Sequence, residues 1–476
     1  MNDFSRMPLV ETLFAAAEGR FSFHMPGHRQ GQSFPTWLRD KLWTLDTTEL
    51  EVTGDLNQPA GKVKEAMNLA AAFFGAGHTR FVTTGTTTSL LTALATACPR
   101  KSQIILPRRV HQAVMHGVAL LDLEPIWADI NINQDVEEAL LRSLHNNPQA
   151  SAVFVTSPGY DGRTVPLRNI ASLVGEMDCS LIVDEAHGSH FVAAPGLLPP
   201  SALSQGADLV AMSAHKTLPA LTPGSYLHVS KVALESGKIG TDKLGQMLKV
   251  FQTSSPSFVI AASLDYARFW LESEGQRSIE KLLTLISQLD QNLPTVVNRT
   301  QTEGSDPLRL TYDYRDSGLN RLEVQGIFNQ YKVDPEIIDL NQIILIPALD
   351  AGIREFKALA LALNALGAAA DTGSTSRASN GDLSWIASLL DSSAPSSIPI
   401  SKVMFGNMKK TEVPLRNAHG RVAAEAIVPY PPGVAMVWPG EIITSERIEA
   451  IEQLISANIA VYGVHKPDSY SVIVLE

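Results

Sequence analysis

One lysine, Lys216, stands where its amine could react with an aldehyde. It lies in the segment SAHKTLPALTPG, residues 213–224, directly after the apolar run DLVAM. An amine forms an imine only when it is sheltered from water and partly deprotonated, and burial favours that state because it penalises the ammonium ion. The alternative is an ordinary exposed lysine, which the small and hydroxyl neighbours of this position disfavour.

A carboxylate, Asp184, ends the strand-like run of the segment LIVDEAHGSH. Pyridoxal phosphate (PLP) accepts electrons only while its ring nitrogen stays protonated, so a PLP site needs a buried carboxylate as partner. Asp184 fits this role. Glu185 is an alternative, although neighbouring strand residues point to opposite faces, and Asp184 could instead cap a helix. With Lys216, this carboxylate predicts PLP as the cofactor.

A phosphate site is expected in the segment RFVTTGTTTSLLTALATA, residues 80–97, which reads as a strand, a glycine turn and an apolar helix. Backbone N–H groups at a helix N-terminus bind anions, and threonine hydroxyls add donors. Candidate phosphate ligands are therefore Gly85, Thr86 and Thr87, with Ser213 and His215 beside the lysine as further donors.

Two more segments follow apolar runs. His111 comes directly after SQIILP, so its imidazole either stacks on the pyridine face of the cofactor or lies on the surface at a helix start. The segment TSPGYDG, residues 156–162, either touches the cofactor or only makes the turn.

These residues need a scaffold, and the chain from Ile104 to about Ser230 alternates short apolar runs with helical patterns. This alternation predicts an α/β fold in which helices cross over between parallel strands. Ligands collect at the carboxyl ends of such strands, where Asp184 and Ser213 are expected.

Three units are expected along the chain. Residues 1–75 form an N-terminal arm with glycine-rich active-site loops, residues 76–290 a large PLP-binding domain, and residues 291–476 a smaller domain. The Ala-, Gly- and Ser-rich stretch at 367–385 predicts a flexible surface loop.

The composition is that of a soluble globular protein, with 45% hydrophobic and 18% charged residues. The net charge of −11 disfavours nucleic acid and suits a cationic small substrate. No long apolar run predicts a membrane span. Cys98 and Cys179 predict buried thiols, with no disulfide and no metal site. We expect a cytoplasmic enzyme.

Several motifs, taken in order, resemble the Orn/Lys/Arg decarboxylase family of fold-type I PLP enzymes, in its compact bacterial form. They are FHMPGHRQG, GTTTS, VHQAVMHG, TSPGYDG, VDEAHGSH, SAHKTL, TSSPSF and GRVAAEAIVPYPPGVAMVWPGE. The likeness covers most of residues 20–265 and then residues 420–441. The flanks of the histidine motif depart from the family pattern, because Arg109, Gln112 and Ala113 replace its usual Asn, Lys and Ser.

The resemblance implies a fold-type I large domain with a mainly parallel sheet, a smaller C-terminal α+β domain, and a homodimer with a shared active site. It also implies individual roles: Lys216 carries PLP as an imine, Asp184 faces the ring nitrogen and His111 stacks on the ring. The other positions it implicates are Ala186 against the ring, His187 near the phenolic oxygen or the substrate, Thr86, Thr87, Ser213 and His215 near the phosphate, and Ser254 and Ser255 near the neighbouring subunit's phosphate.

The activity it implies is decarboxylation of arginine, lysine or ornithine to an amine and CO2 for polyamine synthesis, with Lys216 or His215 close to the proton donor. Glu425 and Glu441 are candidates to bind the distal cation of the substrate, or are surface charges. An aminotransferase or another PLP-dependent lyase, and a catalytically idle homologue, remain alternatives.

Overall fold

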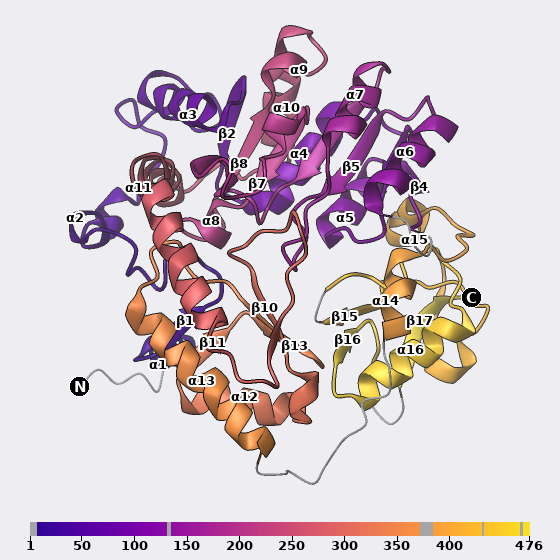
Figure 1. Cartoon of the computed structure of the whole chain (residues 1–476). Helices are drawn as coiled ribbons and strands as arrows, with labels where there is room; N and C mark the ends of the chain where they lie inside the picture. The colour runs from indigo at the N-terminus through magenta and orange to yellow at the C-terminus, as the bar shows by residue number, and fades with distance from the viewer. Residues whose placement is uncertain (1–6, 131–134, 372–383, 431–432, 467–469) are drawn as a thin grey trace.

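A seven-stranded sheet forms the centre of the larger part of the molecule (Figure 1). The computed structural model describes residues 7–130, 135–371, 384–430, 433–466 and 470–476. The strands, in spatial order, are β2 (His78–Val82), β8 (Ser225–Val229), β7 (Leu209–Met212), β6 (Ser180–Asp184), β5 (Ala152–Thr156), β3 (Gln103–Leu106) and β4 (Glu124–Trp127).

Strand β8 runs antiparallel to both of its neighbours, while the pairs from β7 to β4 are parallel. The expected α/β fold with a mainly parallel sheet is therefore confirmed. The strands expected in the runs at SQIILP, AVFVT, SLIVD, DLVAM and SYLHV are all present.

The two faces of the sheet follow the two-residue repeat of its strands. Ile105, Val153 and Val183 belong to one buried apolar cluster, whereas Ile104, Phe154 and Ile182 belong to another. Helices on both faces explain why these strands read as continuous apolar runs. The helices of the first face are α3 (Gly61–Phe74), α6 (Val136–Asn146), α7 (Arg168–Gly175) and α11 (Phe258–Asp290); those of the second are α4 (Gly85–Ala97), α5 (Gln112–Leu120), α9 (Lys231–Glu235) and α10 (Thr241–Phe251).

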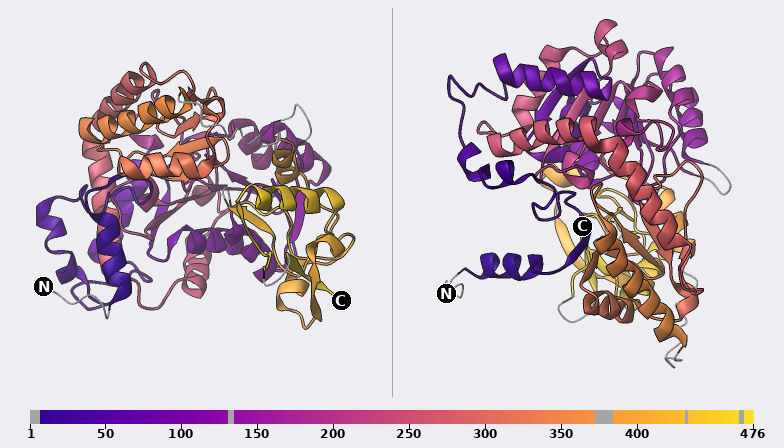
Figure 2. Two further views of the ribbon diagram at one scale, coloured as in Figure 1. Left: turned by 90° about the horizontal axis from the view of Figure 1, so that it is seen from below. Right: turned by 60° about the vertical axis from the view of Figure 1, so that its left-hand side comes forward.

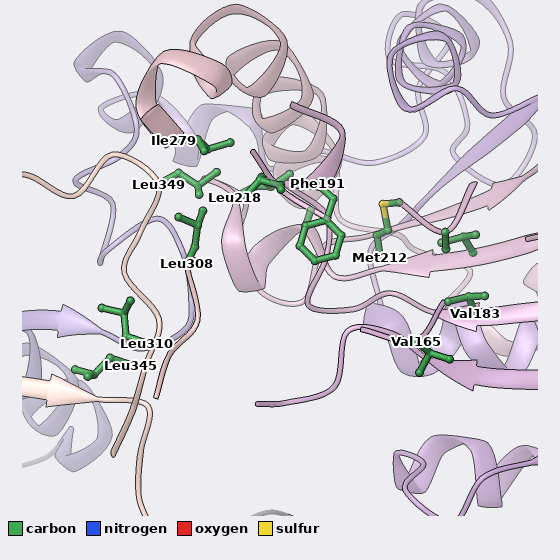
Figure 3. Close-up of a cluster of buried hydrophobic side chains, with 14 of the residues drawn as sticks. Val165, Val183, Phe191, Met212, Leu218, Ile279, Leu308, Leu310, Leu345 and Leu349 are labelled. Carbon is green, nitrogen blue, oxygen red and sulfur yellow. The ribbon is translucent and has the colours of Figure 1, made fainter. Parts of the chain in front are cut away.

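A second, four-stranded sheet follows helix α11, and its side chains extend the first cluster. Leu310 and Leu345 come from this sheet, and Phe191 and Leu218 lie between them and the large sheet (Figure 3). Its strands, in order, are β12 (Ile337–Ile338), β13 (Gln342–Leu345), β10 (Leu310–Asp313) and β9 (Asn298–Arg299), with helices α12 (Arg321–Gln330) and α13 (Ile353–Asp371) packed nearby. The expected boundary at 290 falls at the end of α11, yet the core crosses it.

The C-terminal segment, residues 384–476, lies at the lower right of Figure 1. Its side chains, joined by Leu340, make up a third apolar cluster. The expected 291–476 unit is therefore split, because its four-stranded sheet packs in the core of the large sheet and its C-terminal segment packs mostly in another. Its elements are α14 (Ser384–Asp391), α15 (Ile400–Phe405), α16 (Ser445–Ser456) and the strand pairs β14 (Lys410–Pro414) with β17 (Ser471–Leu475) and β15 (Val428–Tyr430) with β16 (Ala460–Tyr462).

The loop expected at 367–385 is shorter at both ends than the composition suggested. Residues 367–371 continue helix α13 and residues 384–385 begin α14, while residues 372–383 lie outside the described residues. Alanine is the best helix former, so the Ala-rich start of this stretch prolongs the helix.

The N-terminal arm contains helices that the sequence patterns did not reveal, α1 (Pro8–Ala17), the short α2 (Thr36–Arg39) and α3. Helix α1 has no buried residue and lies at the edge of the molecule (Figure 2). Strand β1 (Phe21–Phe23) follows it and pairs in parallel with β11 (Val333–Pro335). Among the helices of the described residues, none is long and apolar enough to cross a membrane.

Candidate active site

Lys216 and Asp184 lie at the carboxyl ends of neighbouring strands. Asp184 is the last residue of β6 and pairs in register with Ala211 of β7. The chain then leaves β7 through Ser213 into the single turn α8 (Ala214–Thr217), which carries Lys216. Sequence-distant groups thus meet at the edge where ligands of parallel sheets collect.

The lysine amine contacts an imidazole that in turn contacts a guanidinium. Lys216 Nζ lies 3.0 Å from His187 Nε2, and Arg309 Nη2 lies 3.0 Å from His187 Nδ1. His187 and Arg309 are both buried. Burial, helped by the Arg309 charge, lowers the pKa of Lys216 to about 8, although Asp184 and Glu336 oppose the fall. The amine can therefore change its protonation near neutral pH.

Asp184 is a buried carboxylate at the end of strand β6. Its Oδ1 accepts a hydrogen bond from the Ala186 N–H at 3.1 Å. Burial raises the pKa of Asp184, while Lys216 and His111 oppose the rise. Glu185 points the other way and accepts from the Ala202 N–H at 3.0 Å, as the strand alternation predicted.

His111 is the N-cap of helix α5, where its Nδ1 accepts from the Ala113 N–H at 3.2 Å. The side chain stays exposed, yet it faces Asp184 and Lys216, whose charges affect its pKa. The protein shields the rest of the ring from water, and this desolvation lowers the pKa of His111. The imidazole thus borders the site with a face open to solvent, and stacking on the cofactor stays a prediction.

The N-terminus of helix α4 has the features of a phosphate site. Gly85 has φ of +86°, and a Cβ there would lie 3.1 Å from Pro223 Cβ. The Thr84 hydroxyl at the N-cap is buried and has no hydrogen-bond partner in the part of the chain that the structure describes. Thr86 hydrogen-bonds with Ser213, and Thr87 is exposed. The orphaned hydroxyl fits the phosphate group of PLP.

The segment FHMPGH closes over the lysine turn. The Gly27 N–H donates to the His215 carbonyl at 2.8 Å, and a Cβ at Gly27 would lie 2.7 Å from the Thr217 carbonyl carbon. His215 Nδ1 lies 3.0 Å from the Gly224 carbonyl oxygen, and burial lowers the pKa of His215 to about 4. Only glycine fits at position 27, which explains the spacing of this motif.

Three residues of the site were not assigned from the sequence, namely Tyr160, Arg309 and Glu336. The Tyr160 hydroxyl donates to Glu336, and its ring packs edge-on against His187 at 5.2 Å between centroids. Glu336 also accepts a hydrogen bond from the Met25 N–H at 2.9 Å, and its charge acts to raise the pKa of Lys216. The TSPGYDG segment therefore reaches the site through Tyr160. No local signal marked Arg309 or Glu336, which lie in bends beside the ends of β10 and β11.

Other predicted residues are not brought to Lys216 by the contacts of this chain. Glu425 is exposed, 3.7 Å from His465, and Glu441 is buried in a two-point ion pair with Arg108. Glu441 also accepts a hydrogen bond from the Trp438 N–H at 2.8 Å. Because Arg108 and Trp438 already bind its two oxygens, the carboxylate links the C-terminal segment to the large domain and does not lie open to a substrate cation. Ser254 and Ser255 are exposed between α10 and α11, where their predicted role toward a neighbouring subunit stays a prediction.

The fold and the site together define a fold-type I PLP enzyme. Solved structures with this fold include the Francisella novicida lysine decarboxylase LdcF, which matches with a TM-score of 0.76 at 17% identity over 98% of this chain and 81% of the other. The constitutive lysine decarboxylase of E. coli matches with the same TM-score at 19% identity, over 98% of this chain and 82% of the other.

The chain belongs to the Orn/Lys/Arg decarboxylase family. The family's major domain matches residues 7–311 and its C-terminal domain matches residues 400–460. Among curated relatives, the uncharacterized protein YaaO of Bacillus subtilis is 32% identical, with 96% of each chain covered. The arginine decarboxylase of the same organism is 30% identical, over 93% of this chain and 92% of the relative. The expected family and cofactor are confirmed.

Replacing Lys216 with alanine should abolish covalent retention of the cofactor. Wild-type protein treated with borohydride is expected to carry PLP on the peptide that contains Lys216, because that half-buried amine has a pKa of about 8. Mass spectrometry of the digest measures this. Lys249→Ala, which removes an exposed lysine on α10, is the matched control. Trapping on another lysine in the wild-type chain would refute the assignment.

Proposed function

We propose that this chain decarboxylates arginine, lysine or ornithine to the corresponding amine and CO2, and that the amine feeds polyamine synthesis. The observation that carries the proposal is the contact of Lys216 with His187 beside the buried Asp184, within a chain of this family. The name of the B. subtilis arginine decarboxylase, matched over nearly the whole chain, supports a basic amino acid as substrate.

Each residue of the site has a task in this chemistry. Bound PLP supplies an electron-accepting ring that stabilises the charge left at the substrate Cα when CO2 departs. Asp184 would keep the ring nitrogen protonated, and the α4 N-terminus with Thr84, Thr86 and Ser213 would hold the phosphate. His111 would cover one face of the ring.

The proton returned to Cα is best carried by Lys216. A group whose pKa lies near the working pH can both accept and return a proton, and the pKa of Lys216 is about 8. Burial keeps the pKa of His215 at about 4, so this imidazole is neutral at pH 7 and holds no spare proton. We therefore assign His215 to packing under Gly27 rather than to proton donation.

Glu336 is our candidate for the carboxylate that binds the distal cation of the substrate. It faces Lys216, and its two oxygens each accept one hydrogen bond, from Tyr160 and Met25. A carboxylate has further lone pairs for an ammonium or guanidinium donor. Glu425 and Glu441 are less suited to bind the substrate cation. Glu425 is exposed beside His465, and the carboxylate of Glu441 is already paired with Arg108.

Release of CO2 and amine from arginine, lysine and ornithine, measured side by side with PLP bound, tests the proposed activity. We expect turnover of at least one of the three, and loss of turnover in Asp184→Asn, because a neutral amide cannot keep the ring nitrogen protonated. Cofactor loading of this variant, read from its visible absorbance, shows whether binding survives. No release from any substrate by loaded wild-type protein would end the decarboxylase proposal.

Glu336→Gln should raise KM for the preferred substrate roughly tenfold with a smaller change in kcat, because a charged hydrogen bond to the bound cation is lost. Steady-state kinetics measure the split. Glu235→Gln on helix α9, at an exposed position, serves as control. A raised KM in Glu425→Gln, with Glu336→Gln unchanged, would return the role to Glu425.

An aminotransferase is a second candidate, because Arg309 places a buried guanidinium in the site. Nη1 and Nε of Arg309 have no hydrogen-bond partner among the described residues. Aminotransferases use an arginine for the α-carboxylate of the substrate, and such a residue was not assignable from the sequence. Adding a 2-oxo acid to the substrate panel separates the two activities, since only a transaminase would convert it to an amino acid.

We further propose a homodimer that works in the cytoplasm. Trp43 and Val52 in the N-terminal arm are 88% and 90% exposed, and helix α1 buries none of its side chains. Large apolar side chains gathered on one arm favour a partner surface. The two free, buried cysteines are compatible with a reducing compartment.

Sedimentation velocity should give twice the mass of the chain, and Trp43→Glu should lower it toward the monomer because a buried charge weakens an apolar interface. Val232→Glu on α9, an exposed apolar position on the large domain, is the matched control. A monomeric wild-type protein at micromolar concentration would contradict the dimer.

A further inference from the structure

Arg309 is held beside the active-site imidazole by its neighbours in the chain. Leu308 and Leu310 are buried in the apolar cluster that runs from the large sheet into the small one, and Figure 3 shows both side chains in it. Arg309 itself is 3% exposed. A Cβ at Gly162 would lie 2.7 Å from Arg309 Cβ, so the TSPGYDG turn packs directly against the arginine. The guanidinium therefore has little freedom to move away from His187.

The contact with Arg309 decides which nitrogen of His187 carries the proton. A guanidinium has only donors, so His187 Nδ1, at 3.0 Å from Nη2, must accept. A neutral imidazole has one N–H, which is then on Nε2. Protonation of both nitrogens is disfavoured, because burial, and then the charges of Lys216 and Arg309, hold the pKa of His187 well below its usual value.

The tautomer of His187 also decides how the imidazole can contact the lysine amine. His187 Nε2 lies 3.0 Å from Lys216 Nζ. An N–H can donate to the lone pair of an amine, but an ammonium has only donors and offers no lone pair. We propose that Arg309 is a positioning residue that holds His187 in the Nε2-protonated tautomer, so that His187 hydrogen-bonds Lys216 only while the amine is uncharged. This inference rests on Lys216 as the cofactor lysine of the proposed function.

Other groups also face these two residues. Around Lys216, Asp184 and Glu336 favour the ammonium, whereas burial and Arg309 oppose it. His111 and His215 face both Lys216 and His187, and Tyr160 packs on the His187 ring. Arg309 thus lowers the pKa of Lys216 in two ways, directly through its charge and indirectly through His187. A test has to separate the two.

The first readout is the pH midpoint for acetylation of Lys216 in the full chain stripped of PLP. Acetic anhydride reacts with the uncharged amine, and mass spectrometry of the Lys216 peptide gives the rate at each pH. We expect a midpoint near 8 in the wild type, little change in Arg309→Lys, which keeps a charged donor, and a rise of about one pH unit or more in Arg309→Met.

The His187→Phe background separates the charge effect from the tautomer effect. If Arg309 acts through the imidazole, Arg309→Met raises the midpoint less in this background than in the wild type, because only the charge effect remains. Equal rises in the two backgrounds would overturn the proposal. Circular dichroism identifies any variant that fails to fold.

The second readout observes the tautomer directly and does not need the double variant. In chain labelled with 15N-histidine, the His187 signals, identified by their loss in His187→Phe, should show a protonated Nε2 and an unprotonated Nδ1 in the wild type and in Arg309→Lys. Arg309→Met should shift the population toward the other tautomer. A proton on Nδ1 in the wild type would refute the proposal. Neither readout depends on turnover, so a chain without decarboxylase activity still tests it.

Discussion

The desolvation of the Lys216 amine without a carboxylate in direct contact is the constraint on which the rest of this site depends. A direct ion pair with a carboxylate would hold Lys216 as an ammonium, whereas an isolated buried charge is too costly to persist. Among the ion pairs of the described residues, Lys216 is not joined to Asp184; its close contact is with His187 at 3.0 Å. The balance of burial against a nearby carboxylate sets the pKa of Lys216 at about 8.

This balance needs groups from distant parts of the chain. Asp184 and His187 come from the end of β6, Arg309 from the residue before β10, and Glu336 from the residue after β11. The parallel pairing of β1 with β11 places the FHMPGH segment between Glu336 and the lysine turn, where Met25 and Gly27 contact one each. The small sheet is therefore part of the active site and not only a neighbour of it.

The continuous apolar cluster explains how such a site keeps its geometry. Leu308 and Leu310, which flank Arg309, and Leu218, which follows the lysine turn, pack in the same cluster. A shift of one sheet against the other would open this core at a cost of about 1.5 to 3 kcal/mol for each leucine exposed. Most of the C-terminal segment has a core of its own, but Ile400, Ala435 and Trp438 pack into the cluster on the second face of the large sheet. The buried Arg108–Glu441 pair adds a polar link between the two parts, and it occupies the Glu441 carboxylate.

The strands of the large sheet, the glycine turn before α4 and the positions of Lys216 and Asp184 followed from local patterns, because apolar runs and turn residues act over a few residues of chain. The helices of the N-terminal arm were missed because the glycine-rich loops drew the interpretation, although α1 has Leu9, Val10, Leu13 and Phe14 at helical spacing with none of them buried in this chain. The ends of the loop expected at 367–385 were wrong for a similar reason, since composition does not mark where a helix stops.

The sequence by itself determined the family and predicted Lys216 as the cofactor lysine with Asp184 as its carboxylate partner, because these depend on the order of motifs and on residue types at the ends of strands. Only the tertiary structure decided that Arg309, Tyr160 and Glu336 join them and that Glu441 does not. Arg309, Tyr160 and Glu336 lie in turns and bends beside strands, and a polar side chain there shows its role only when its partners are known. The packing that brings Arg309 to His187 is a long-range hydrophobic contact, which no local pattern records.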